Sequence, residues 1–328
     1  MTSYKDIRAE TGLALSTISK HFNGLPVRPE NRAAIEAAAA RLDYRPNVLA
    51  SGLRSQRSRT VGVLLPVLDN SFHLALIAGV EAALRPAGLS VIVSSSPDAQ
   101  VGAAELLRTR QVDGIIAVAS PHDLEALRRA ASEIPVVLID WEADVPGSDG
   151  VYLDNREAGR IAARHLLDHG HRALAVVGGD RSISTTDDRT EGFLAEAADA
   201  GVEVDPELVT SGPLTLDQGR RAMSQILLQR GRPTAVFSSN YELTLGAVIA
   251  MNESGLRIGE DISLVGFDAT DLARATQPTL TRIEQPEHEI AAQAAARIRA
   301  RLEGGPEAAP ERVVLAPRLV TGGSVRRL

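Results

Sequence analysis

The sequence predicts an α/β protein with a small helical head and a larger core of two doubly wound lobes. A pair of short helical segments surrounds Gly12 near the N-terminus. From Thr60 onward, apolar strand-like runs alternate with helical stretches, and a second set of such runs begins after Asn155. Alternating strand and helix signals indicate parallel sheets that helices cover on both faces. Two such sets predict two lobes with a cleft between them, at the carboxyl ends of the strands.

The first element is a helical hairpin from Ser3 to Asn23. Ser3 followed by Asp6 is a helix start of the capping-box type, with Asp in place of the usual Glu. The apolar residues that would close two short helices around the turn at Gly12 are Ile7, Leu13 and Ile18. Two helices joined by a short glycine-containing turn are typical of the helix-turn-helix unit, whose second helix fits the major groove of DNA. A small helical hairpin with a polar face is the alternative interpretation.

The second helix of this hairpin is predicted over residues 15–23 and has a polar face without a carboxylate. The side chains on that face are Ser16, Thr17, Ser19, Lys20 and Asn23. Hydrogen-bonding groups with a single cation suit a surface that faces phosphates. A third helix is predicted over residues 29–42, because Pro29 suits a first helical position and apolar residues follow at helical spacing.

Charge is divided unequally along the 328-residue chain. Residues 1–60 hold ten Lys and Arg against five Asp and Glu, a net charge of +5, although the whole chain carries −7. The remaining residues hold 25 basic against 37 acidic side chains, a net charge of −12. A basic head on an acidic body directs a polyanion to one end of the molecule.

Composition excludes several classes of protein. The chain has no cysteine, and its only lysines are Lys5 and Lys20, both in the head. Disulfides, thiolate metal sites, a P-loop lysine and a pyridoxal Schiff base are therefore excluded from the core. The N-terminus lacks the apolar segment of a signal peptide, and no apolar run reaches the roughly 18 residues of a membrane span. We expect a cytoplasmic protein that is not an enzyme, without a cofactor and without a membrane partner.

The core is predicted in two sets of elements. The first set of strands is V-G-V-L-L, L-S-V-I-V, V-D-G-I-I-A-V and P-V-V-L-I, with helices over residues 74–87, 102–110 and 123–133. The second set is R-A-L-A-V-V-G-G, A-V-F-S-S and D-I-S-L-V-G-F, with helices near residues 156–169, 189–200, 217–229 and 241–253. Ligand contacts are expected just after strands, where a doubly wound sheet opens into its cleft.

A series of motifs follows the hairpin in a fixed order over almost the whole chain. They are Y-R-P-N-V-L-A-S-G-L-R-S-Q-R-S-R-T-V-G-V-L-L-P, V-D-G-I-I, I-P-V-V-L-I-D, D-N-R-E-A-G-R, H-L-L-D-H-G-H-R, E-G-F, V-G-F-D and Q-P. With the hairpin, this series resembles the LacI/GalR family of bacterial transcription regulators. The resemblance implies a periplasmic-binding-protein-like core whose chain crosses three times between its lobes.

The resemblance also implies domain boundaries. A helix-turn-helix DNA-binding domain is expected over residues 1–46, a hinge helix and linker over 47–59, and an effector-binding and dimerisation core over 60–328. Crossings near residues 155, 285 and 310 would divide that core. Lobe 1 would comprise about 60–155 and 286–310, and lobe 2 about 156–285 and 311–328.

In the family, a hinge helix follows the head. Two copies of it pair in the minor groove and push a leucine between base steps, which bends the DNA. Leu53 occupies the position of that leucine, and Asn47 can cap the short helix. A flexible polar linker is the alternative. Within the head, Leu15 and Ser16 lie at the two positions that most often read bases in the family.

The same resemblance places the effector contacts at Asn70, Phe72, His73, Glu157, Arg189, Leu214, Asn240, Asp268 and Gln285. Arg189 falls on the family's effector-binding arginine, whose guanidinium suits a carboxylate, a phosphate or vicinal hydroxyls. Leu214 stands where many relatives carry an aromatic residue that stacks on the ligand. As alternatives, Asn70 fills a loop, Phe72 packs in the core, and Asp268 caps a turn.

The motif H-L-L-D-H-G-H invites a metal interpretation, because His165 and His169 share a helix face and His171 follows. No cysteine or well-placed carboxylate completes a site, and the family uses this motif structurally, so we expect no metal. The sequence thus predicts a homodimeric or larger transcription regulator, most simply a repressor. It would bind a pseudo-palindromic double-stranded operator and respond to a small polar metabolite such as a sugar. A non-sugar corepressor such as a nucleobase, an enzyme on the same lobes, and a pure binding protein are the alternatives.

Overall fold

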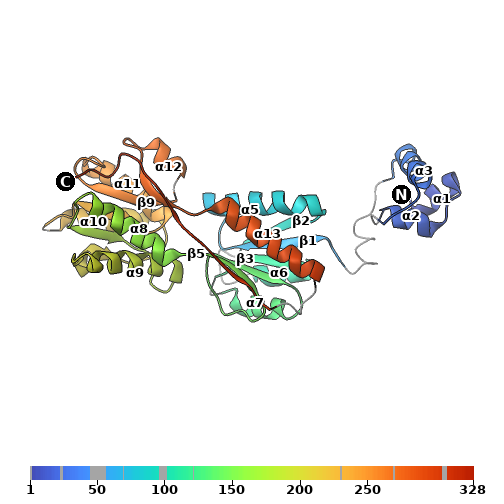
Figure 1. The fold of residues 1–328 in the computed structure, drawn as a ribbon, viewed down its shortest axis with the longest axis horizontal. Coiled ribbons are helices and arrows are strands. Elements are labelled where there is room, and N and C mark those ends of the chain that lie inside the picture. The colour runs from blue at the N-terminus through green and yellow to red at the C-terminus, as the bar shows by residue number, and fades with distance from the viewer. Residues whose placement is uncertain are drawn as a thin grey trace. The chain divides into compact units, whose positions relative to one another are not determined.

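The computed structural model describes residues 2–22, 25–44, 57–68, 70–95, 102–120, 122–229, 231–268, 270–304 and 309–328. The chain divides into two compact units, Met1–Arg59 and Thr60–Leu328 (Figure 1). Among the described residues, no helix combines the length and the apolar character that crossing a membrane requires.

The first unit contains three helices, α1 (Tyr4–Thr11), α2 (Leu15–Phe22) and α3 (Pro29–Arg41). The capping box at Ser3 and Asp6 is present, and α1 ends at Gly12, whose φ of 70° is left-handed. Both features agree with the sequence prediction, because only glycine adopts that turn without strain. The residues that form the buried centre of this unit are Ile7, Ile18, Ile35 and Ala38.

The second unit begins with a six-stranded sheet in the order β11-β5-β4-β3-β1-β2. Its strands are β1 (Thr60–Leu65), β2 (Ser90–Ser95), β3 (Gly114–Val118), β4 (Val136–Ile139), β5 (Asp149–Leu153) and β11 (Arg312–Leu315). All adjacent pairs are parallel. This sheet is the centre of lobe 1.

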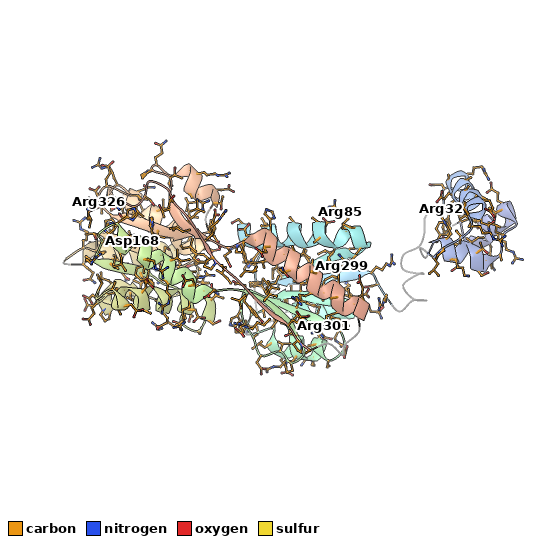
Figure 2. All side chains as sticks on the ribbon, viewed as in Figure 1. Arg32, Arg85, Asp168, Arg299, Arg301 and Arg326 are labelled. Carbon is orange, nitrogen blue, oxygen red and sulfur yellow. The ribbon has the colours of Figure 1, made fainter. Side chains whose placement is uncertain are left out.

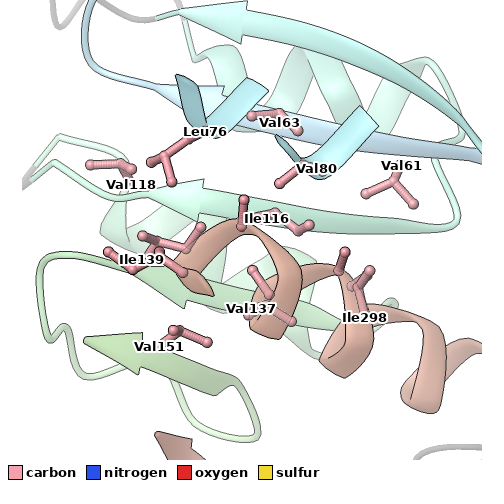
Figure 3. Close-up of a cluster of buried hydrophobic side chains, with 14 of the residues drawn as sticks. Val61, Val63, Leu76, Val80, Ile116, Val118, Val137, Ile139, Val151 and Ile298 are labelled. Atoms are coloured by element: carbon pink, nitrogen blue, oxygen red, sulfur yellow. The ribbon is translucent and has the colours of Figure 1, made fainter. Parts of the chain in front are cut away.

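Helices cover both faces of the first sheet. The helices of lobe 1 are α5 (Ser71–Leu84), the short 3₁₀ helix η1 (Arg85–Ala87), α6 (Ala103–Thr109), α7 (Leu124–Ala131) and α13 (Glu287–Gly304). On one face, α5 and α13 pack over the strand valines and isoleucines, with Leu76, Val80 and Ile298 among the contacts (Figure 3). On the other face, α6 and α7 bury Leu107 and Leu127. Buried on both faces, the strands are as continuously apolar as parallel sheets require.

The second lobe repeats this plan with the strand order β12-β10-β9-β8-β6-β7. Its strands are β6 (Leu174–Val177), β7 (Val209–Thr210), β8 (Ala235–Ser238), β9 (Ser263–Phe267), β10 (Thr281–Glu284) and β12 (Arg318–Val320), of which β12 alone is antiparallel to its neighbour. Its helices are α8 (Asn155–Asp168), α9 (Ser184–Asp199), η2 (Pro206–Leu208), α10 (Leu216–Leu228), α11 (Tyr241–Ser254) and α12 (Thr270–Ala275). Helices α8 and α9 cover one face of the sheet, and α10 and α11 cover the other.

The chain crosses between the lobes three times. The first crossing lies at Asp154, between β5 and α8, and the second at Gln285 and Pro286, between β10 and α13. The third lies at residues 316–317, between β11 and β12, where the C-terminal segment runs from one lobe into the other (Figure 1). The prediction of a crossing near residue 310 was therefore wrong. Residues 312–315 pair with β5 and still belong to lobe 1.

An ion pair joins α13, the helix that follows the second crossing, to strand β5 of lobe 1. Arg301 of α13 (Figure 2) donates to the carboxylate of Asp149 over 2.7 and 2.9 Å, at the start of β5. Both side chains are almost completely buried, and the backbone N–H of Glu311 donates to the same carboxylate over 2.8 Å. Charge-assisted bonds of this kind fix geometry strongly. Strands β5 and β11 and helix α13 are thereby held together within lobe 1.

Candidate functional site

Helix α2 presents the predicted DNA contacts of the head. Ser16 and Lys20 are exposed, and Leu15, Thr17 and Ser19 are half-buried at the edge of the same surface. The helix contains no acidic residue, and its last turn carries Lys20 and a histidine. Three of the predicted DNA contacts, Asn23, Asn47 and Leu53, lie outside the described residues.

A cavity of about 300 Å³ lies between the two lobes of the core. Eight of the nine predicted effector contacts line it, and they are Asn70, Phe72, His73, Arg189, Leu214, Asn240, Asp268 and Gln285. They come together because parallel strands of both sheets point their carboxyl ends into the cleft. Lobe 1, lobe 2 and the second crossing therefore all contribute side chains to one site.

Glu157 is the predicted contact that does not line the cavity. It lies on the outer side of α8, where its carboxylate is 3.5 Å from the guanidinium of Arg164. Asn155, two residues earlier at the start of the same helix, faces inward and is buried. Helical geometry turns residues two apart away from each other, so Asn155 of the D-N-R-E motif contacts Arg189 of the cavity wall and Glu157 does not.

Arg189 is the most deeply buried charge of the cavity, with 4% of its surface exposed. Its Nε donates to Asn155 Oδ1 over 2.8 Å, and its Nη1 donates to the backbone oxygen of Ser239 over 2.9 Å. The guanidinium also lies 3.6 Å from the ring centroid of Phe267. Burial lowers the pKa of Arg189, while the nearby carboxylates of Asp140 and Asp268 act in the opposite direction. These contacts hold the guanidinium in one orientation.

Two aspartates, one from each lobe, face Arg189. Asp140 directly follows β4, and Asp268 directly follows β9, the strand at the equivalent place in the second sheet. Both adopt left-handed backbone conformations, with φ of 66° and 54°. Non-glycine residues in that region are strained and cluster at functional sites. Asp140 Oδ1 lies 3.9 Å from Arg189 Nη2.

Asp268 is hydrogen-bonded to Gln285 at the second crossing. Its Oδ1 accepts from the backbone N–H of Gln285 over 3.2 Å, and its Oδ2 accepts from Gln285 Nε2 over 2.9 Å. Burial raises the pKa of Asp268 to about 6, although Arg189 and the two hydrogen bonds from Gln285 oppose that rise. Arg189 is likewise bound to the first crossing through Asn155. The two buried charges therefore connect the cavity to two of the three segments that join the lobes.

Two asparagines begin helices at the cavity. Asn70 caps α5, because its Oδ1 accepts from the backbone N–H groups of Phe72 and His73. Asn240 caps α11 by accepting from the N–H of Leu243. Asn70 Nδ2 also donates to Glu242 Oε1 across the cleft, over 2.7 Å. Asn70 thus orders its own helix and joins lobe 1 to lobe 2.

Several lining residues were missed by the sequence analysis. Asp140, Trp141 and Ser120 come from lobe 1, and Ser182 and Glu242 come from lobe 2. Asp140 and Trp141 directly follow the P-V-V-L-I strand, so the rule that located Asp268 would also have found them. Trp141 is the single tryptophan of the chain. It supplies an aromatic surface to the cavity from the lobe opposite Leu214.

The three histidines of H-L-L-D-H-G-H divide into two roles. His171 is fully buried, and its ring nitrogens contact Thr234 Oγ1 at 2.8 Å and the backbone oxygen of Arg326 at 3.1 Å. His165 and His169 lie with their ring centroids 4.3 Å apart on α8. Over the described ranges, no group of three or more His, Cys, Asp or Glu side chains is arranged to hold a metal ion.

The raised pKa of Asp268 predicts a pH dependence of stability. The unfolded carboxyl has a pKa near 3.9, and the folded one is raised to about 6. The folded state then holds the proton more tightly, so the contribution of Asp268 to stability is full below about pH 4 and falls as the pH rises to about 6. The loss is on the order of 3 kcal/mol at 1.36 kcal/mol per pKa unit.

Urea unfolding from pH 4 to 8 measures this effect when the wild type is compared with Asp268→Asn. The free energy of unfolding of the variant, minus that of the wild type, should increase from pH 4 to pH 6 and then stay constant. A difference that is flat across that window, or that decreases, would contradict the assignment.

Comparisons with known proteins agree with this architecture. A periplasmic binding protein-like domain matches residues 163–325. The HTH-type transcriptional repressor PurR of Yersinia enterocolitica is 31% identical, over 99% of this chain and 97% of that protein. The lac repressor bound to ONPG in the repressed state superposes with a TM-score of 0.84 at 26% identity, covering 98% of this chain and 99% of that one.

Two further structures were solved with a sugar. The CelR–cellobiose complex has a TM-score of 0.74 at 26% identity and covers 99% of this chain and all of that one. A LacI family regulator from Enterococcus faecium with bound ribose has a TM-score of 0.74 at 28% identity, covering 82% of this chain and 99% of that one.

A helix-turn-helix head joined to a two-lobed core, with buried polar side chains around the cavity between the lobes, defines the class of ligand-responsive, DNA-binding transcription repressors. The chain belongs to the LacI/GalR family of these regulators. The relatives with which it aligns from end to end are repressors and not enzymes.

Proposed function

We propose that the cavity between the lobes is the effector site and that a small polar metabolite there, a sugar or sugar derivative, changes operator affinity. The observation that carries this proposal is that both lobes and the second crossing place buried hydrogen-bonding groups around one cavity. A ligand that contacts both lobes has different affinities for different lobe arrangements, so it shifts the equilibrium between them. The cellobiose and ribose bound to two structural relatives support a sugar.

The head would read DNA through α2. Base contacts are proposed for Leu15, Ser16, Thr17, Ser19, Lys20 and Asn23. Two heads of a homodimer would read a near-palindromic operator, because the symmetry of a dimer is mirrored in its site. Leu53 would enter the minor groove between base steps from the paired hinge helices, with Asn47 capping each helix. The protein would act in the cytoplasm, where its DNA lies.

The core carries a surface that suits a second copy. Val67, Leu68, Leu74 and Ile92 of lobe 1 are all more than a third exposed. Large exposed apolar side chains are candidates for contact with a second copy. They support a homodimer, on which a larger oligomer can be built.

A second candidate is a nucleobase corepressor, which would strengthen DNA binding. The observation that favours it is that aromatic rings of Phe72 and Trp141 line the cavity, although Leu214 offers none. Planar bases stack on such rings. Titrating operator affinity against sugars and nucleosides distinguishes the two, because an inducing sugar lowers that affinity and a corepressor raises it.

Selection of duplexes from a random pool by the intact protein tests the proposal. The selected sequences should be near-palindromic, and the isolated residues 60–328 should select none. Leu53→Ala should lower the affinity for the selected operator by roughly tenfold or more, because it removes the contacts that an intercalating side chain makes with the base steps. The fold should stay unchanged by circular dichroism.

Leu228→Ala is the matched control, since Leu228 is 85% exposed on the core and should leave affinity unchanged. Selection without any symmetric preference would refute dimeric operator recognition. Unchanged affinity of Leu53→Ala would refute the wedge alone.

A further inference from the structure

The charges that line the cavity are unbalanced. Among the described residues, its wall contains the carboxylates of Asp140, Glu242 and Asp268 and a single guanidinium, that of Arg189. Residues 60–328 contain no lysine, so no ammonium group of the core can restore the balance. The cavity therefore has a negative formal charge, and its partly apolar wall strengthens the resulting field.

The one guanidinium is already engaged. Two of its nitrogens donate to Asn155 Oδ1 and to the backbone oxygen of Ser239, and the third faces Asp140 Oδ1 at 3.9 Å. An anion needs at least two free guanidinium donors on one edge for bidentate binding. Its Nε donor and one Nη1 donor are occupied, and the carboxylate of Asp140, 3.9 Å from Nη2, would repel an anion that approached the remaining donors.

Two of the helices that begin at the cavity, α5 and α11, carry asparagine caps, whereas α9 begins at Ile183 without a side-chain cap. Free backbone N–H groups at a helix start form an anion site. At α5 the side chain of Asn70 accepts from two of these N–H groups, over 2.9 and 3.3 Å. At α11 Asn240 accepts from the N–H of Leu243 over 3.2 Å. These caps occupy three of the backbone donors that a phosphate or carboxylate would use.

Two buried acceptors at the cavity remain without a hydrogen bond among the described residues, Gln285 Oε1 and Asp140 Oδ1. The orientation of the Gln285 amide is fixed because its Nε2 donates to Asp268 Oδ2, which leaves its oxygen as the unpaired atom. An unpaired buried acceptor destabilises the site until a donor reaches it. Phosphates and carboxylates bring acceptors only, whereas hydroxyl, amino and ammonium groups bring donors.

We infer that the cavity selects its ligand by charge: it takes a neutral or cationic molecule rich in hydroxyl or amino donors and excludes metabolites that carry a phosphate or carboxylate. Donors of that molecule pair with Gln285 Oε1 and Asp140 Oδ1. This rests on the proposed function in treating the cavity as the effector site. The sign of the cavity's field holds whether or not an effector binds there.

Fluorescence quenching of Trp141 tests the inference on the intact protein without any ligand. Trp141 is the only tryptophan and lines the cavity, so its emission reports that cavity alone. Quenching by caesium, iodide and neutral acrylamide is measured at constant ionic strength and referred to free N-acetyltryptophanamide. We expect the caesium-to-iodide ratio of quenching constants to exceed that of the free compound by about threefold or more, since a negative field concentrates cations.

Glu242→Gln should lower that ratio toward the free value. Asp217→Asn, which removes an exposed carboxylate on the outer helix α10, should leave it unchanged. A ratio equal to or below that of the free compound would overturn the inference. So would a tryptophan that acrylamide does not reach, because it would not face an open cavity.

A second test measures the melting temperature of the intact protein with each of a panel of ligands. The panel contains glucose, glucosamine, glucuronate, glucose 6-phosphate and the matching ribose compounds. Stabilisation by a neutral sugar or an amino sugar, but not by its acid or phosphate, supports the inference. Stabilisation by an anionic form and not by its neutral parent would overturn it. If no compound in the panel binds, the quenching ratio alone decides the charge selection, and the sugar proposal is the one that loses support.

Discussion

Gly192→Ala is expected to lower the free energy of unfolding of the core by about 3 kcal/mol, the upper part of the range for overpacked interiors. A Cβ at Gly192 of α9 would lie 2.0 Å from the backbone oxygen of Arg156 on α8. A Cβ at Gly159 of α8 would lie 1.9 Å from the backbone oxygen of Arg189. The two helices therefore touch backbone to backbone, and neither backbone can move away as a flexible side chain would.

Urea unfolding followed by circular dichroism measures the effect. Gly304→Ala is the matched control, because a Cβ there meets nothing within 4 Å. It should change stability by less than about 1 kcal/mol, in the favourable direction, as alanine usually does for glycine in a helix. Equal stability of Gly192→Ala and the wild type would show that α8 and α9 are less closely packed than described.

The same contact has a functional consequence. Arg189 lies one turn before Gly192, and its Nε reaches Asn155 at the start of α8 over 2.8 Å. If an added methyl group separates α8 from α9, that hydrogen bond lengthens or breaks. Gly192→Ala should therefore weaken the response of operator binding to the effector more than it weakens operator binding itself, although the residue is remote from the cavity surface.

Much of this site was predictable because strand ends are predictable. Apolar runs located the sheets, and parallel topology brings the carboxyl ends of their strands to one cleft. Asn240 and Asp268 followed from that rule together with the family resemblance, and Arg189 required the resemblance alone. Glu157 lies outside the cavity because a motif fixes a segment, whereas the rotation of a helix decides which of its side chains faces inward.

The missing strands explain the other errors. Strands β5 and β10 contain polar residues such as Asp149 and Arg282 that interrupt their apolar pattern, and β11 is short. Only β11 has its partner strand, β5, far away in the chain, so tertiary pairing alone stabilises it. Without β11 the third crossing was placed too early. Helix α9 also starts at Ser184 instead of Arg189, because its Ser- and Thr-rich first turns are weak helix formers that burial of Thr185 and Thr186 stabilises.

The left-handed conformations of Asp140 and Asp268 had no signal in the sequence, since neither residue is glycine. They arise where strands β4 and β9 end against the cleft. Strain of about 1–3 kcal/mol per residue persists only where surrounding structure imposes it. Two hydrogen bonds from Gln285 hold Asp268 in this conformation. Gln285 is distant in the sequence, so the sequence around Asp268 does not indicate the strain.

Arg189→Ala is expected to cost about 3–5 kcal/mol of stability at pH 7, the range for breaking a buried charge pair by removing one partner. The substitution leaves Asp268 and Asp140 without a cation, and it leaves Asn155 Oδ1 and the Ser239 carbonyl oxygen without their donor. The pKa of Asp268 should rise further, because Arg189 is one of the groups that hold it down. The cost should therefore shrink as the pH falls toward 5, where Asp268 takes up a proton.

Urea unfolding at pH 5 and 7 measures both parts of this prediction. The control is Arg164→Ala on the exposed side of α8, where ion pairs with Glu157 and Glu196 are partly solvated. It should cost less than about 1 kcal/mol at either pH. The double variant Arg189→Ala/Asp268→Asn should recover part of the loss at pH 7, because it removes the uncompensated charge. A loss that is independent of pH and is not relieved in the double variant would mean that Arg189 stabilises the core by packing against Phe267 alone.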